Sequence, residues 1–190
     1  MHAGAIFALF PNLRRTATRH YAAGTIHSME IMELLRYADW SKERLRSTIE
    51  ANPDAWDREY ETISGYKSIR ALTAHLAGAE ERWLMRILRR PQPDLSYEVR
   101  SGLSVADVFE GWDGIRSALT EFVRTAGPED LSAQHKVFLP SVNLDIDLRV
   151  DQMLWQIFNH QTYHLGQIST AFQRWSIDPP NFDVVLMIAV

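Results

Sequence analysis

The stretch Asn159-His160-Gln161-Thr162-Tyr163-His164-Leu165-Gly166-Gln167-Ile168 lies inside a long run of helical periodicity at 150–177. Residues four apart on a helix project from the same face, about 6 Å apart along the axis. His160 and His164 would therefore stand side by side, and apolar residues of the same face, such as Met153, turn the pair toward the protein interior. The pair is a candidate for two ligands of a buried metal ion, with a third ligand coming from another helix.

Spacing alone is weak support for such a site, because seven histidines give about 0.2 pairs at this separation by chance. A lone interior histidine is more often a hydrogen-bonded core residue than a ligand. Two on one apolar face are harder to explain in that way, since burying two imidazoles without partners costs a few kcal/mol. The motif is not the HExxH of zinc peptidases, because Gln161 cannot act as a general base.

Composition favours a single globular domain. The chain has 190 residues, 46% of them hydrophobic, and no Gly/Ser-rich linker or internal repeat divides it. A net charge of −4 argues against a nucleic-acid partner, and no apolar run approaches the roughly 20 residues of a membrane span. Cysteine is absent, so histidine and carboxylate are the strong metal ligands that remain. We expect a cytoplasmic protein that binds neither nucleic acid nor membrane.

The first 28 residues differ from the rest of the chain. They carry Arg14, Arg15 and Arg19, and no acidic residue precedes Glu30. The apolar residues 3–10 come before these arginines, which is the reverse of a secretory signal. A transit peptide would fit the composition, but we interpret 1–28 as an N-terminal extension or arm and 29–190 as the folded domain.

Four amphipathic segments predict helices at Ser28–Ala51, 68–89, 104–126 and 150–177. Proline steps end all four, and Ser104 with Asp107 forms a capping-box pattern at the start of the third. Alternating polarity at 144–150, with 135–139 before it, predicts a short strand pair. Residues 184–190 are interpreted as a short helix closing one end. The expected fold class is all-α, a four-helix bundle with a short strand pair between helices 3 and 4 and a short C-terminal helix.

His75 is the other histidine expected beside an apolar stripe in a helix interior. His2, His20, His27 and His135 are interpreted as surface or turn residues. Gly78 would let another helix approach closely. Glu80 and Glu81 are expected on a solvated face of the second helix, and the six tryptophans in the core and at interfaces.

Three stretches of the chain resemble the DinB-like (DinB/YfiT) metalloenzymes over about residues 30–190. They are Tyr37-Ala38-Asp39-Trp40 with Glu43-Arg44-Leu45, Leu72-Thr73-Ala74-His75-Leu76-Ala77-Gly78-Ala79-Glu80 followed by Trp83, and Asn159-His160 to His164-Leu165-Gly166-Gln167-Ile168. The last is the most specific. The resemblance implies a four-helix bundle holding a divalent metal, often nickel or zinc, through one histidine of the second helix and two of the fourth: His75, His160 and His164. Leu165 departs from the pattern, because many relatives have arginine there.

Three neutral imidazoles would leave positions on the ion for water or substrate, as in catalytic sites. The resemblance implies a small-molecule substrate and either thiol S-transfer, with a low-molecular-weight thiol such as bacillithiol or mycothiol as cosubstrate, or hydrolysis. It also implies a homodimer. We expect a metal-dependent enzyme with thiol transfer ahead of hydrolysis, and no catalytic residue beyond the ligands is predicted. The alternative is a non-catalytic, stress-related bundle that binds a metal or small ligand.

Overall fold

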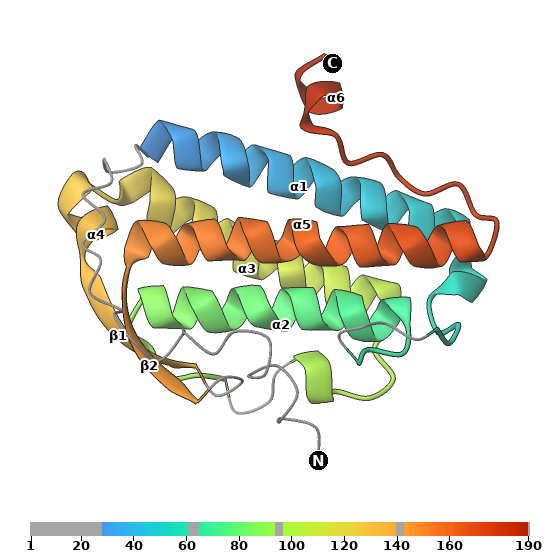
Figure 1. The fold of residues 1–190 in the computed structure, drawn as a ribbon, viewed down its shortest axis with the longest axis horizontal. Coiled ribbons are helices and arrows are strands. Elements are labelled where there is room, and N and C mark those ends of the chain that lie inside the picture. The colour runs from blue at the N-terminus through green and yellow to red at the C-terminus, as the bar shows by residue number, and fades with distance from the viewer. Residues whose placement is uncertain (1–27, 61–64, 94–96, 140–142, 190) are drawn as a thin grey trace, which may run out of the picture.

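A computed structural model describes residues 28–60, 65–93, 97–139 and 143–189 of the chain. Four long helices lie side by side (Figure 1): α1 Ser28–Ala51, α2 Ile69–Ile87, α3 Val105–Thr125 and α5 Val150–Arg174. The predicted all-α bundle is confirmed, and the predicted helix ends differ from these by no more than three residues. The predicted arm lies outside the described residues except for Ser28, where α1 begins. No helix in the described part is long and apolar enough to span a membrane.

The order of the helices around the bundle is α1, α3, α2, α5, with each helix packed on the two beside it. The colours in Figure 1 show that α1 and α5 run in one direction and that α2 and α3 run in the other. The connection between α2 and α3 carries the short 3-10 helix η2, Tyr97–Val99. Another 3-10 helix, η1 at Pro53–Ala55, follows α1. Because α2 and α5 are antiparallel neighbours, His75 on α2 reaches the middle of α5.

Local capping explains where two of the long helices begin. At α3 the predicted capping box is present: Asp107 N donates to Ser104 Oγ at 3.1 Å, and Ser104 N donates to Asp107 Oδ2 at 2.8 Å. At α2 the side chain of Ser68 accepts from Ala71 N at 3.1 Å. These bonds satisfy backbone donors that a helix leaves unpaired at its start.

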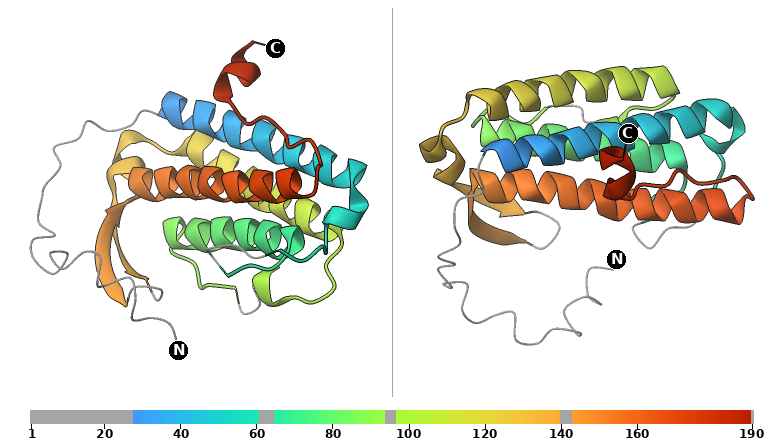
Figure 2. Two further views of the ribbon diagram at one scale, coloured as in Figure 1. Left: turned by 45° about the vertical axis from the view of Figure 1, so that its right-hand side comes forward. Right: turned by 90° about the horizontal axis from the view of Figure 1, so that it is seen from above.

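Smaller elements flank the bundle. The predicted strand pair is confirmed as β1 Gln134–Leu139 and β2 Leu144–Arg149, which pair antiparallel with Val137 opposite Ile146. A short helix that the sequence did not predict, α4 Pro128–Ser132, places Leu131 in the core. The C-terminal helix α6 Val184–Ile188 is present, but it lies beside α1 and projects from the bundle (Figure 2), so it does not close an end. Its Ile188 is 74% exposed.

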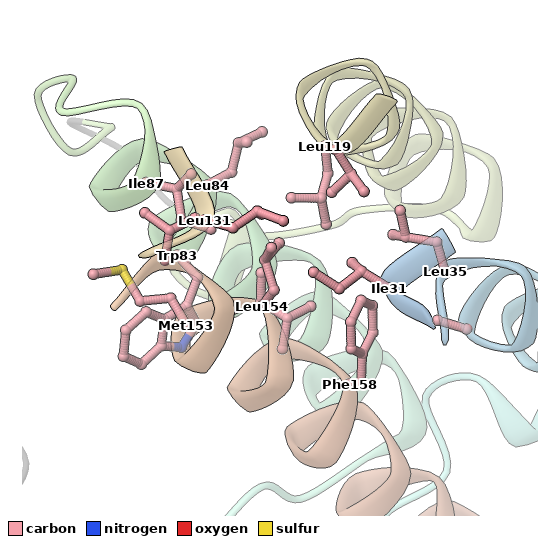
Figure 3. Packing of buried hydrophobic residues seen from close by; sticks show 14 of the residues in the cluster. Ile31, Leu35, Trp83, Leu84, Ile87, Leu119, Leu131, Met153, Leu154 and Phe158 are labelled. Atoms are coloured by element: carbon pink, nitrogen blue, oxygen red, sulfur yellow. The ribbon is translucent and has the colours of Figure 1, made fainter. Parts of the chain in front are cut away.

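The apolar core forms two clusters along the bundle. The cluster at the strand-pair end joins all four long helices through residues such as Leu35, Trp83, Leu119 and Phe158 (Figure 3). The cluster at the other end contains Leu72, Phe109, Trp112, Leu165 and Phe172, among others. Of the six tryptophans predicted in the core and at interfaces, Trp56, Trp83 and Trp112 are buried in the two clusters and Trp175 packs against the second, whereas Trp155 is 54% exposed.

A buried polar layer lies between the two clusters and contradicts one prediction. Glu80 is 3% exposed, not part of a solvated face, and Glu81 is half-buried. The carboxylate of Glu80 accepts from Trp112 Nε1 at 2.7 Å and from Arg116 Nε and Nη2 at 2.6 Å each. Arg116 also donates to Gln161 Oε1 at 2.9 Å. Burial of the charge is possible because α3 supplies a matching cation and donors.

Candidate metal centre

The three predicted histidines meet on the seam between α2 and α5. His160 and His164 project from successive turns of α5, and His75 approaches them from α2. The Nε2 atom of His160 lies 3.1 Å from Nε2 of His75 and 3.1 Å from Nε2 of His164. One nitrogen from each ring lies within 4.8 Å of the other two, so the three histidines could hold a metal ion. His135 lies elsewhere, beside Arg89.

The separation of the nitrogens suits a small divalent ion. With zinc–nitrogen bonds of about 2.0–2.1 Å, two ligand nitrogens lie about 3.4 Å apart at a tetrahedral angle and about 2.9 Å apart at a right angle. The observed 3.1 Å falls between these values. Three imidazole nitrogens also form a donor set that zinc, nickel and copper accept well.

Hydrogen bonds on the far sides of two rings fix the direction of their lone pairs. His75 Nδ1 donates to Glu98 Oε1, and His164 Nδ1 donates to Gln167 Oε1 at 3.0 Å. Each neutral ring holds one proton, so both Nε2 atoms present lone pairs to the centre. His160 can offer at most one proton to its two neighbours. At least one Nε2–Nε2 contact therefore sets two lone pairs against each other, and a cation between them would remove this repulsion.

The surroundings keep two of these histidines neutral. Burial, with the nearby His164 and His75, lowers the pKa of His160 from 6.5 to about 3. Burial also lowers the pKa of His164, although its hydrogen bond to Gln167 acts in the opposite direction. Metal ligands must be deprotonated to bind, and these two nitrogens meet that condition at neutral pH without an ion present.

Sequence reasoning missed three polar residues next to the histidines. Arg82 donates to Glu98 Oε2 at 2.6 Å and to Oε1 at 3.0 Å, and Tyr66 Oη lies 2.5 Å from His75 Nδ1. Burial tends to raise the pKa of Glu98, but hydrogen bonds from His75 and Arg82 lower it to about 2. Burial and the charge of Glu98 raise the pKa of Tyr66 to about 12. Arg82 could have been found from its spacing, because it follows His75 by two helical turns.

The site lies close to the surface on the α5 side. The rings of Tyr163 and His164 have centroids 5.0 Å apart, and Tyr163 is 55% exposed. His160 is half-buried. Leu165 is 1% exposed in the second apolar cluster, so this position offers no group for binding an anion.

Comparison with known proteins gives one family assignment. A family model described as the DinB family matches residues 23–189, which is most of the chain. No curated protein matches the sequence.

Proposed function

The chain belongs to the DinB family, and we propose that it is a metal-dependent enzyme whose divalent ion is held by His75, His160 and His164. The convergence of the three Nε2 atoms is the observation that carries this proposal. Zinc and nickel are the ions we favour, because the family resemblance implies them and imidazole nitrogen suits both. When bound, the ion would supply Lewis acidity, which lowers the pKa of a neighbouring water or thiol and yields a nucleophile near neutral pH.

We favour thiol transfer over hydrolysis because of the groups around the histidines. A thiol, with a pKa of about 8.5, is partly ionised near neutral pH without the ion, whereas water, with a pKa of about 15.7, depends wholly on the ion for its deprotonation. Glu98 is a poor base, because its pKa is about 2. Tyr66 has a pKa of about 12, so its hydroxyl stays protonated at neutral pH and does not serve as a base.

The chain has no cysteine, so the nucleophilic sulfur would come from a small thiol cosubstrate. The thiol would lose its proton to solvent. Its sulfur would then bond to an electrophilic carbon of the second substrate while the leaving group departs with the bonding electrons. The reactants would meet on the α5 side of the histidines, beside the exposed Tyr163.

Thiol conjugation to a chromogenic aryl halide tests the proposal. Zinc- or nickel-loaded protein should accelerate conjugation of at least one low-molecular-weight thiol, and a chelator should abolish the acceleration. His160→Ala should be inactive, while His135→Ala, which removes a histidine outside the site, should keep the wild-type rate. A rate that survives chelation would overturn the proposal. Metal binding without activity on thiols or esters would favour a non-catalytic binding bundle.

We also propose that the protein is a homodimer. A groove of about 840 Å³ lies between α1, α5 and the C-terminal segment, and its lining is mainly apolar. Trp155 and Ile188 line this groove, and each is more than half exposed. Contiguous exposed apolar surface of this kind is typical of protein interfaces. Light scattering should give twice the mass of one chain, and Trp155→Glu should shift it toward the monomer; a monomeric wild type would contradict the proposal.

A further inference from the structure

Glu98 contacts His75 from outside the ligand helices, as Tyr66 does, and its position depends on how η2 is seated. A β-carbon built at Gly78 of α2 would lie 3.6 Å from Glu98 Cγ and 3.6 Å from Tyr97 N. On the neighbouring helix α3, a β-carbon at Gly111 would overlap the side chain of Tyr97. At Gly78 a β-carbon would also lie 3.3 Å from Arg82 Nη1, so a side chain larger than alanine at Gly78, or any side chain at Gly111, would prevent η2 from lying directly against α2 and α3. The segment that approaches Gly78 is the 3-10 helix η2.

The carboxylate of Glu98 joins η2 to both the candidate metal centre and a cation of α2. Its Oε1 accepts from His75 Nδ1, and both of its oxygens accept from the guanidinium of Arg82, at 2.6 and 3.0 Å. The side chains of Glu98 and Arg82 are 22% and 26% exposed, so the pair is largely shielded from water. A two-point contact between guanidinium and carboxylate fixes the orientation of the carboxylate as well as its distance.

We propose that Glu98 is a positioning residue of the metal centre, holding His75 with Nε2 toward His160 and coupling the docking of η2 to metal binding. This inference rests on the proposed three-histidine site. A neutral imidazole can carry its proton on either nitrogen, and a carboxylate at Nδ1 selects the form whose Nε2 is a free and more basic ligand. Coupling is reciprocal, so the factor by which docked η2 strengthens metal binding is the factor by which metal strengthens docking.

Tyr66 cannot make this selection by itself. Its hydroxyl lies 2.5 Å from His75 Nδ1, but a hydroxyl can donate as well as accept, so it is compatible with either tautomer. The carboxylate of Glu98 only accepts, and it therefore requires a proton on Nδ1. The double variant Glu98→Ala with Tyr66→Phe removes both partners of His75 Nδ1. Comparing its zinc affinity with that of Glu98→Ala measures what the Tyr66 hydroxyl contributes once the carboxylate is gone.

Competition with a chromogenic chelator gives the zinc affinity of each variant. Glu98→Ala should bind zinc about 10- to 100-fold more weakly than wild type, the usual effect of removing such a partner. The zinc affinity of Glu98→Gln should lie between those of wild type and Glu98→Ala, because its amide oxygen can still accept from His75. Glu121→Ala, which removes an exposed carboxylate paired with Arg124, should leave the affinity unchanged.

A second pair of variants tests the docking of η2 without removing a polar group. Gly78→Val adds bulk where Glu98 and Tyr97 approach α2, and it should weaken zinc binding in the same direction as Glu98→Ala. Gly114→Val is the matched control, because nothing lies within 4 Å of a β-carbon there. Hydrogen exchange supplies the reciprocal measurement: zinc should slow exchange of the amides of 97–99 in wild type and have little effect on them in Glu98→Ala.

Spectroscopy separates positioning from general stability. In metal-free wild type, nitrogen-15 NMR should show the His75 proton on Nδ1, whereas Glu98→Ala should show a mixture of tautomers. If wild type binds zinc and Glu98→Ala binds it within about threefold as tightly, the inference fails and the proposed metal site stands. If wild type binds no zinc, the proposed function itself fails. Should Glu98→Ala not fold, Glu98→Gln decides: wild-type affinity together with a mixed His75 tautomer overturns the inference.

Discussion

Replacing Glu80 by alanine should destabilise the bundle strongly, because the change leaves a cation buried without its main partner. Arg116 is 2% exposed and makes two hydrogen bonds to the Glu80 carboxylate, each at 2.6 Å. Burial by itself would lower the pKa of Arg116, but the charge and hydrogen bonds of Glu80, together with the charges of Asp39 and Asp113, raise it. The guanidinium will still be charged in Glu80→Ala, because arginine is not deprotonated in proteins. Trp112 Nε1 would lose its acceptor as well.

The expected loss in the free energy of unfolding is about 3 kcal/mol. Removing one partner from a buried ion pair typically costs about 3–5 kcal/mol. We take the lower end because Arg116 keeps its hydrogen bond to Gln161 and lies 3.4 Å from Asp39, whose side chain is 44% exposed. With a urea m-value of about 2 kcal/mol/M, the midpoint should fall by about 1.5 M.

Urea unfolding followed by far-ultraviolet circular dichroism measures this loss, with chelator present so that metal binding does not contribute. Glu121→Ala on the same helix as Arg116 is the control, since its exposed pair with Arg124 should contribute no more than about 1 kcal/mol. The double variant Glu80→Met with Arg116→Met should lose less than Glu80→Ala, because no unpaired charge remains buried. A loss below about 1 kcal/mol for Glu80→Ala would refute this reasoning.

Two further measurements test the site and the packing beside it. The pKa of His160 is about 3 when folded and about 6.5 when unfolded, so the unfolded chain binds more protons between these values. The stability of metal-free protein should therefore fall as pH decreases from 6.5 toward 3, by up to about 1.4 kcal/mol per pH unit from this group. His160→Gln should flatten the urea-derived profile, and an equal slope in both proteins would contradict the shift. Gly111→Ala should lower the free energy of unfolding by about 1–3 kcal/mol, because the added methyl group displaces Tyr97. The control Gly114→Ala should be neutral or stabilising by up to about 1 kcal/mol. Equal urea midpoints for the two variants would exclude the steric contact at Gly111.

Local sequence patterns were sufficient for most of the fold. The capping box at Ser104, the proline steps and the two-residue alternation of β2 each involve only a few neighbouring residues. They can therefore be recognised without knowledge of the tertiary structure. The four-residue spacing of His160 and His164 placed them on one helix face for the same reason. Pairing them with His75 required both its expected burial and the family resemblance.

Features that depend on partners from distant segments could not be predicted. Glu80 is charged and looks like a surface residue until Arg116 of α3 is placed against it. Glu98 lies in a connection without a periodic pattern, and its role depends on the seating of η2 between Gly78 and Gly111. The projection of α6 from the bundle likewise depends on how the preceding segment runs over α1, which apolar composition does not reveal.

The metal content of purified protein is the most direct test of the central claim. After equilibration with zinc and removal of free ion, wild type and His135→Ala should each retain about one ion per chain, because three ligands suffice for a site with open positions. His160→Ala should retain much less, since its Nε2 lies between those of the other two histidines. Equal zinc content in wild type and His160→Ala would contradict the three-histidine site.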